Sequence, residues 1–261
     1  MAPLTALKAI VLDLDGVLYV EDEPVPGAVD AVAALRDRGL GLRFATNTTS
    51  RPRRGILERL RRLGFDVEPQ ELVTPAALAV RHCAERGHGN VALVMNDELR
   101  EDFADLDAPG AGPVDAVVVG DCGEDFDFAL LNGAFRSLMD GAELIALQKN
   151  RFWMRPDGLA LDVGPFVAAL EYGAGVEAHV VGKPAPAFFA AILDDLGVAA
   201  PDAAMVGDDV ESDVGGALAA GLAGVLVRTG KFREDRLRSS GVEPTEIVDS
   251  IADVPALVQP A

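Results

Sequence analysis

The sequence AIVLDLDGVL at residues 9–18 decides the fold expected for this chain. Its first four residues are apolar and predict a short buried strand. Asp13 and Asp15 follow with one leucine between them, and residues two apart on an extended backbone point to the same side. We therefore expect both carboxylates at the carboxyl end of the strand, where they would repel one another without a cation or a shared proton.

Two interpretations of this stretch are open. Paired carboxylates suit a divalent metal site that also holds a nucleophile and an acid partner. Asp and Gly are also common where a strand runs into an ordinary turn. The rest of the chain distinguishes between them.

The bulk composition describes a folded protein with one large domain or two moderate ones. Of its 261 residues, 49% are hydrophobic and 25% are charged, which is typical of globular chains. The formal net charge of −19 disfavours nucleic acid and anionic membranes as partners, because both attract lysine and arginine clusters. The acidity itself is best explained by solubility.

The two cysteines and the N-terminal sequence indicate an intracellular protein. Cys83 and Cys122 have no pairing or metal-ligand spacing, so we expect buried structural thiols in a reducing compartment. Residues 1–8 contain no long apolar segment. We therefore predict no signal peptide, no membrane span and a cytoplasmic location.

Apolar strand-like runs alternate with helical patterns, which predicts an α/β protein with a largely parallel sheet. One helix is expected at residues 27–38, and a second begins after residue 50 with Arg51, Arg53 and Arg54 in its opening turns. A third helix follows Pro184 and ends near residue 196, and a fourth is expected at 251–258. In the first and last thirds, strands are expected from Ala9 onward and at residues 42–45, 179–181, 203–206, 224–227 and 247–248.

A separate set of strands occupies the middle of the chain. These strands are expected at residues 91–95, 116–119 and 144–147, with a helix at 130–139. Residues suited to catalysis gather at strand ends in the first and last thirds and are missing from the middle. We therefore predict a discontinuous catalytic domain, residues 1–79 and 180–261, with an inserted domain at residues 80–179.

Four predicted strand ends carry polar residues, and ligands bind outside the carboxyl ends of strands in an open parallel sheet. Each residue alone has an ordinary explanation: a helix cap for Thr46 or Asp213, a solvated loop cation for Lys183, a turn for Asp208. Their joint occurrence favours an active site. Its candidate residues are Asp13, Asp15, Thr46, Asn47, Lys183, Asp208, Asp209 and Asp213.

These motifs resemble those of the haloacid dehalogenase superfamily of phosphatases over nearly the whole chain. The Asp-x-Asp-Gly motif of that superfamily matches residues 13–16, and its second motif matches Thr46 and Asn47. Its lysine matches Lys183, and its Gly-Asp-x-x-x-x-Asp motif matches residues 207–213. The resemblance implies a Rossmann-like, doubly wound parallel sheet core with an inserted α/β cap domain of subclass IIA.

Further stretches resemble a narrower group that contains the phospholysine phosphohistidine inorganic pyrophosphate phosphatases and their close relatives. They lie at residues 161–165, 169–172, 213–217 and 228–231. This resemblance leaves the substrate open among phosphoamino acids, pyrophosphate, sugar phosphates and pyridoxal phosphate. Relatives often pair through the cap, so the resemblance leaves a homodimer open for this chain.

The resemblance implies a hydrolase that works through an aspartyl-phosphate. Asp13 would attack phosphorus, and Asp15 would act as general acid and then general base. Mg²⁺ would be held by Asp13, by the backbone carbonyl of Asp15 and by Asp208. The substrate would be a small phosphorylated molecule.

The resemblance also implies roles for the remaining residues. Thr46 and Lys183 would bind the phosphate oxygens, and Asn47 would contact the substrate beside the phosphate. Asp213 would support the metal through water or through Lys183. Either Asp209 or Asp213 is expected to pair with that lysine.

The short connection from Gly16 to Pro26 leaves little to cover the site, so the inserted domain is expected to act as a lid. Its candidate pocket residues have an equally good interpretation as core aromatics and surface arginines. They are Phe126, Phe128, Arg151, Trp153 and Arg155.

Other functions are less well supported. A dehalogenase needs neither Asp15 nor Asp208, and a signalling receiver module is usually half this length. A phosphomutase or phosphotransferase, and a non-catalytic phosphate-binding regulatory protein, stay open. No serine-hydrolase elbow or nucleotide-binding phosphate loop occurs. The histidines match no motif and receive no role; they are His82, His88 and His179.

Overall fold

The structure is a computed structural model that describes residues 4, 7–106, 112–155 and 158–258. The chain forms two compact units. The first comprises Met1–Thr46, Leu57–Val73 and Lys183–Ala261, and the second comprises Asn47–Ile56 and Thr74–Gly182.

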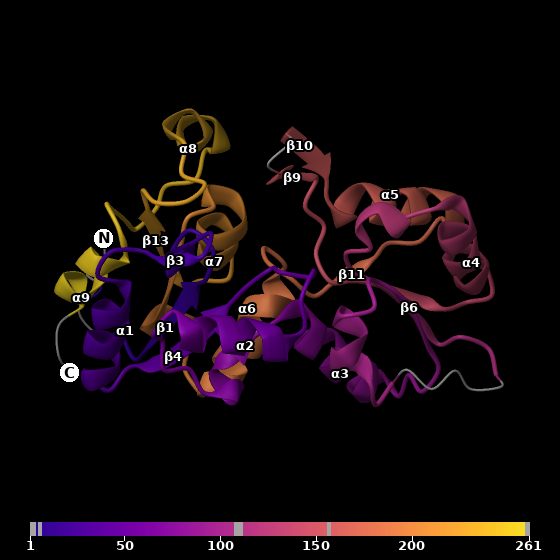
Figure 1. Ribbon diagram of the computed structural model, residues 1–261, viewed down its shortest axis with the longest axis horizontal. Coiled ribbons are helices and arrows are strands. Elements are labelled where there is room, and N and C mark those ends of the chain that lie inside the picture. Colours follow the sequence, from indigo (N-terminus) through magenta and orange to yellow (C-terminus); the bar gives the residue numbers. More distant parts are fainter. Residues whose placement is uncertain (1–3, 5–6, 107–111, 156–157, 259–261) are drawn as a thin grey trace. The chain divides into compact units, whose positions relative to one another are not determined.

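A parallel sheet of six strands forms the centre of the first unit. The strands are β1 (Ala9–Asp13), β4 (Gly41–Ala45), β5 (Leu72–Val73), β12 (Ala203–Gly207), β13 (Ala223–Val227) and β14 (Glu246–Val248). They are ordered β14-β13-β12-β1-β4-β5, and every pair is parallel. Figure 1 labels β1, β4 and β13 of this sheet. The chain winds from β1 towards β5 and later from β12 towards β14, so the winding direction reverses between β1 and β12. This confirms the predicted doubly wound, Rossmann-like sheet, in which ligands bind at that reversal point.

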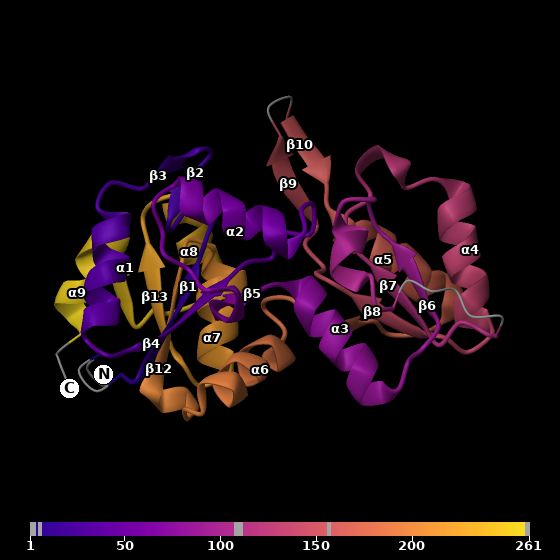
Figure 2. The same cartoon turned by 60° about the horizontal axis from the view of Figure 1, so that its bottom comes forward.

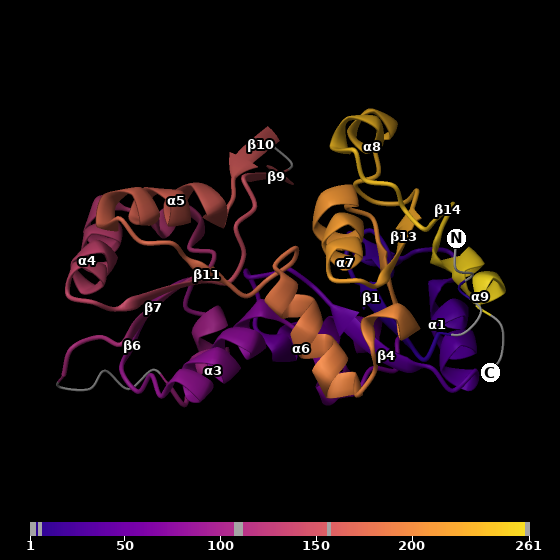
Figure 3. The ribbon, with the colours of Figure 1, turned by 180° about the vertical axis from the view of Figure 1, so that it is seen from behind.

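Helices and one short hairpin complete the first unit. The hairpin of β2 (Tyr19–Val20) and β3 (Glu23–Pro24) follows β1 directly. The helices are α1 (Ala28–Asp37), α6 (Pro186–Leu196), α7 (Gly216–Ala219), α8 (Glu234–Ser240), α9 (Val254–Leu257) and α2 (Arg53–Arg62), which begins in the second unit. Helix α1 packs against α9, and α6 packs against α7 (Figure 3).

In the residues that the structure describes, the second unit has its own parallel sheet and its own helices. Its strands are β6 (Val91–Val94), β7 (Ala116–Val119), β8 (Glu143–Ala146) and β11 (His179–Val180), ordered β11-β8-β7-β6. The helices are α3 (Pro75–Arg86), α4 (Phe128–Met139) and α5 (Val163–Ala174). An antiparallel hairpin joins β9 (Phe152–Arg155) to β10 (Gly158–Leu161).

Alternate residues of β7 build two separate cores in the second unit. Val118 packs in a cluster with Cys83 of α3. Val117 packs in a cluster with Leu138 of α4 and Val167 of α5. Since successive strand residues point to opposite faces, this sheet is covered by helices on both sides (Figure 2).

Several local details differ from the sequence prediction. Strand β1 ends at Asp13, so Asp15 lies beyond the strand and forms an isolated bridge with Tyr19. Helix α2 begins at Arg53, which leaves Arg51 ahead of it. The hairpin β9–β10 was not predicted. Side chains such as Leu159 and Leu161 are exposed, so the hairpin has no buried face that would produce an alternation of apolar and polar residues in the sequence.

The unit boundaries also fall elsewhere than residues 79/80 and 179/180. Residue 79 lies inside α3, and the whole helix belongs to the second unit because Ala76, Ala79 and Cys83 pack into its core.

Both cysteines are buried free thiols. Burial raises the pKa of Cys83 to about 11 and that of Cys122 to about 12, so neither is an activated thiolate. Among the described residues, no helix has the length and apolar character needed to cross a membrane.

Candidate active site

A buried lysine bridges two carboxylates at the carboxyl end of the first unit's sheet. Asp13 closes β1, Lys183 precedes α6 and Asp213 follows β12, and their exposed fractions are 7%, 3% and 1%. The Lys183 Nζ atom lies 2.5 Å from Asp13 Oδ1 and 2.7 Å from Asp213 Oδ1. Burial alone would lower the pKa of Lys183, but the two carboxylates outweigh it and raise that pKa above its usual range. Lys183 is therefore cationic at any working pH.

Asp208 lies at the same sheet edge with one unsatisfied oxygen. Its side chain is buried, and Oδ2 accepts a 2.7 Å hydrogen bond from the backbone N–H of Lys231. The other oxygen, Oδ1, is buried and has no hydrogen-bond partner among the described residues. A buried oxygen without a donor is costly, and it is the kind of atom that a hard cation coordinates.

Three carboxylates converge around this point. One oxygen each from Asp13, Asp208 and Asp213 lie within 4.8 Å of one another. Burial raises the pKa of all three, with that of Asp208 at about 8 and that of Asp213 at about 6. For Asp208, repulsion from the other two carboxylates adds to the effect of burial. An all-oxygen donor set with excess negative charge fits a divalent cation such as Mg²⁺.

Two glycines make the close approach to Asp208 possible. Gly16 has φ +84° and Gly230 has φ +64°, a backbone region that favours glycine. A Cβ atom on either residue would lie 2.0 Å from Asp208 Oδ2. The glycine of Asp-x-Asp-Gly is thus needed for space at the site as well as for the turn.

Asp15 lies past the end of β1 beside an aromatic ring. The Tyr19 hydroxyl donates a 3.3 Å hydrogen bond to Asp15 Oδ2. The Arg59 guanidinium carbon lies 4.3 Å from the centre of the Tyr19 ring. Burial and the Asp15 charge raise the pKa of Tyr19, so the hydroxyl stays a donor. Sequence reasoning missed Tyr19, because nothing in its spacing marks it as a partner of Asp15.

The other predicted residues are divided between the two units. Thr46 is buried directly after β4, and its N–H donates to Val73 O. Asp209 does not pair with Lys183, since its Oδ1 accepts from the N–H groups of Glu211 and Ser212. Asn47 belongs to the second unit. Sequence reasoning also assigned no role to residues 229–231, although it singled out that stretch.

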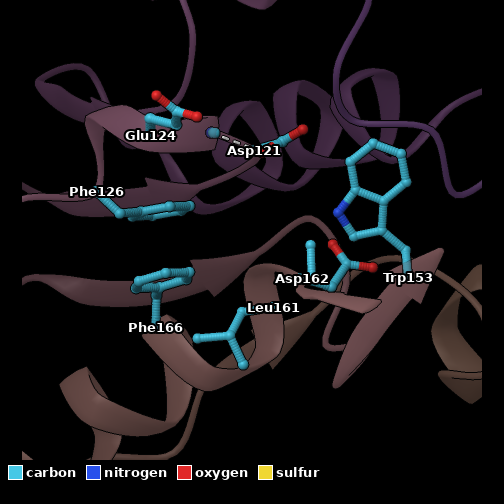
Figure 4. A pocket seen from close by; sticks show the side chains of 9 residues that line it. Asp121, Glu124, Phe126, Trp153, Leu161, Asp162 and Phe166 are labelled. Atoms are coloured by element: carbon cyan, nitrogen blue, oxygen red, sulfur yellow. Dashed lines mark hydrogen bonds between the residues drawn. The ribbon is translucent and has the colours of Figure 1, made fainter. Parts of the chain in front are cut away.

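A cavity of about 300 Å³ lies within the second unit (Figure 4). Phe126 and Trp153 line it, and Phe126 stacks on Phe166 with ring centres 3.7 Å apart. Their predicted place in a substrate pocket under the lid stays a prediction. Phe128 is 82% exposed and Arg151 is also exposed, and neither lines this cavity. The side chain of Arg155 lies outside the described residues.

Comparison with known sequences identifies the family. Residues 10–108 match the family model described as haloacid dehalogenase-like hydrolase, and residues 180–254 match a second HAD-hydrolase-like model. The human haloacid dehalogenase-like hydrolase domain-containing protein 2 is 45% identical over 233 residues, covering 89% of this chain and 88% of that protein. The human phospholysine phosphohistidine inorganic pyrophosphate phosphatase is 39% identical over 263 residues, covering 97% and 96%.

Solved structures agree with this match. The p-nitrophenyl phosphatase from Archaeoglobus fulgidus has a TM-score of 0.88 at 29% identity, covering 96% of this chain and 98% of that one. The glycerol phosphate phosphatase from Mycobacterium tuberculosis, solved in complex with magnesium, has a TM-score of 0.80 at 28% identity, covering 96% and 77%. The chain belongs to the haloacid dehalogenase-like hydrolases, and the predicted subclass IIA resemblance is confirmed.

Proposed function

We propose that this chain is a Mg²⁺-dependent phosphohydrolase that cleaves small phosphorylated molecules through an aspartyl-phosphate on Asp13. The coarser statement, phosphatase activity of the haloacid dehalogenase type, is supported by the named phosphatases among its relatives. The single observation that carries the finer proposal is the buried cluster of Asp13, Asp208 and Asp213 around Lys183. In this proposal the first unit is the catalytic core and the second unit is the cap.

The donor set near Asp208 supports the choice of metal. Carboxylate oxygens of Asp13 and Asp208 and the backbone carbonyl of Asp15 would hold Mg²⁺, and Asp208 Oδ1 is a buried oxygen that accepts no hydrogen bond from the described part of the chain. When bound, Mg²⁺ would supply the positive charge that allows an anionic nucleophile to approach an anionic phosphate.

Asp13 is positioned to act as the nucleophile. Its Oδ1 is held 2.5 Å from the Lys183 ammonium, which fixes the carboxylate and leaves Oδ2 for attack on phosphorus. The bond from phosphorus to the leaving oxygen breaks as the bond to Asp13 forms. Water then attacks the aspartyl-phosphate and releases inorganic phosphate.

Asp15 would move the proton in both half-reactions. It gives a proton to the leaving oxygen and then takes one from the attacking water. The hydrogen bond from Tyr19 to Asp15 Oδ2 holds that carboxylate in place. Thr46 and Lys183 would bind the transferring phosphate, Asn47 would contact the substrate beside it, and Asp213 keeps Lys183 in position.

Substitution of the nucleophile tests the mechanism. We expect Asp13→Asn to lose on the order of 10³-fold or more in kcat with p-nitrophenyl phosphate, because an amide cannot form the acyl-phosphate. A variant that keeps turnover within tenfold of wild type, after contaminating phosphatases are excluded, would refute the assignment. Release of inorganic phosphate to water distinguishes hydrolysis from transfer to an acceptor.

Chelation tests the metal. Activity should vanish in EDTA and return with excess Mg²⁺, whereas activity that persists under chelation would exclude the proposed metal role. A panel of phosphorylated metabolites, including phosphoamino acids and pyrophosphate, would then identify the substrate class.

A further inference from the structure

All three histidines of the chain gather around one glutamate in the second unit. His82 lies on α3, His88 follows that helix, His179 begins β11 and Glu143 begins β8. His82 and His88 are six residues apart, whereas Glu143 and His179 lie 55 and 91 residues beyond His88, and the tertiary structure of the unit brings all four together. None of them belongs to the acidic site described above.

The contacts in this cluster are short and specific. His82 Nε2 lies 2.9 Å from Glu143 Oε1, and His88 Nε2 lies 2.6 Å from Glu143 Oε2. The His82 and His179 rings are stacked, with centres 4.0 Å apart and planes 14° apart. One ligand atom each from His82, Glu143 and His179 lie within 4.8 Å of one another.

We propose that His82, Glu143 and His179 form a binding site for a divalent transition-metal ion of the zinc class. Two imidazoles and one carboxylate are a donor set that Zn²⁺ uses in three-ligand sites, with water in the fourth position. With metal–ligand bonds of about 2.0–2.2 Å, tetrahedral ligand atoms lie roughly 3.3–3.6 Å apart. The ligand atoms of this cluster lie within 4.8 Å of one another, so they have to approach by up to about 1.5 Å, and one of the stacked rings must turn towards the ion.

His88 would hold the liganding carboxylate from the other side. Its contact with Glu143 Oε2 leaves Oε1, the oxygen facing His82, for the metal. Carboxylate ligands are commonly oriented by such outer hydrogen bonds. The Arg86 Nε atom lies 3.5 Å from Glu143 Oε2, but that side chain is 62% exposed and can turn into solvent.

The partial burial of the cluster suits a site that an ion can enter. The side chains of His82, Glu143 and His88 are 18%, 24% and 14% exposed. The site differs in chemistry from the all-oxygen cluster of the first unit, because imidazole nitrogen favours zinc-class ions over Mg²⁺. Metal binding here would tie α3, β8 and β11 together and stabilise the second unit.

The test uses the full chain, stripped of metal and kept in millimolar Mg²⁺ so that the acidic cluster is saturated. Titration with Zn²⁺ against a chromogenic chelator should give one equivalent bound with a submicromolar Kd and a rise in Tm. His82→Asn and Glu143→Gln should each weaken binding by 100-fold or more, and His88→Gln by about tenfold. Glu177→Gln, an exposed glutamate of the same unit, is the matched control and should change nothing.

Wild-type protein provides a readout that does not depend on variants folding. Zn²⁺ should shift the side-chain NMR signals of at least two of the three histidines at one equivalent. Absence of stoichiometric binding, binding unchanged in Glu143→Gln, or binding lost only in Asp208→Asn would each overturn the proposal. Because neither readout is activity, failure here is distinguishable from failure of the proposed phosphatase mechanism.

Discussion

At the scale of single residues, each buried charge of the candidate active site depends on a neighbouring residue that neutralises it or leaves space for it. Lys183 is buried between Asp13 and Asp213, and removal of one partner from such a pair leaves an unpaired buried charge. The Oδ2 atom of Asp208 has space only because Gly16 and Gly230 carry no Cβ atom. These residues therefore have to be considered as a set.

The lysine can be tested by charge removal. We expect Lys183→Met to abolish activity and to lower the free energy of unfolding by about 3–5 kcal/mol, since the two carboxylates lose their cation. Urea unfolding in Mg²⁺-free buffer measures the change. The double variant Lys183→Met/Asp213→Asn removes one of the stranded charges, so it should recover part of the stability without recovering activity. Equal stability of the single and double variants would contradict this account.

Gly230 can be tested against a glycine with similar backbone geometry. Gly230→Ala places a Cβ atom 2.0 Å from Asp208 Oδ2 and 2.5 Å from the Gly16 Cα atom. We expect kcat/KM to fall by on the order of 10²-fold, because the Asp208 carboxylate must move. Gly87→Ala has φ +74° but meets nothing within 4 Å, so it should cost about 1 kcal/mol of stability and leave kcat/KM unchanged. Wild-type kcat/KM in Gly230→Ala would show that Asp208 tolerates displacement.

At the scale of elements, the helices and strands predicted best are those that bury one face and whose ends are marked by a residue that terminates them. Helix α1 buries Ala28, Val32 and Leu35 at helical spacing, and β7 is apolar throughout and buried. The hairpin β9–β10 was missed, since Trp153 is 48% exposed and such a strand has no alternating pattern. Elements held by a few local contacts are harder to predict from the sequence than elements that pack into a hydrophobic core.

Helix α4 offers a test of local capping. Asp127 Oδ1 accepts a 2.7 Å hydrogen bond from the Leu130 N–H at the start of this helix. We expect Asp127→Ala to lower the free energy of unfolding by about 1 kcal/mol, because the first turn loses its cap. Asp125→Ala, an exposed neighbour ahead of the helix, should lie within about 0.5 kcal/mol of wild type. Equal losses in both variants would show that charge rather than capping is responsible.

At the scale of the whole molecule, the buried carboxylates couple stability to pH and to metal. Burial raises the pKa of Asp208 to about 8 and that of Asp213 to about 6, above the ordinary value of 3.8. An acid whose pKa is raised by folding is destabilising once it ionises. Its cost therefore grows as pH rises from about 4 through the folded pKa.

We therefore expect the Tm of metal-free protein to fall between pH 5 and pH 8 more steeply than that of Asp208→Asn, in which one such acid is absent. Mg²⁺ should raise the Tm of wild type more at pH 8 than at pH 5, because protons no longer compete for the carboxylates. Thermal melts over this range, with and without Mg²⁺, measure both effects. Parallel curves for the two proteins would indicate that Asp208 is already ionised without penalty.

The sequence by itself determined the α/β class, the strand ends that carry chemistry and the family, because hydrophobic periodicity and motif spacing are local properties. Only the tertiary structure decided which side chains meet. Lys183 and Asp13 are 170 positions apart, and Asp213 rather than Asp209 completes that bridge because Asp209 caps its own helix. The grouping of His82, His88 and His179 on Glu143 was likewise invisible in sequence. Three separate elements bring those residues together, and no local spacing records how such elements pack.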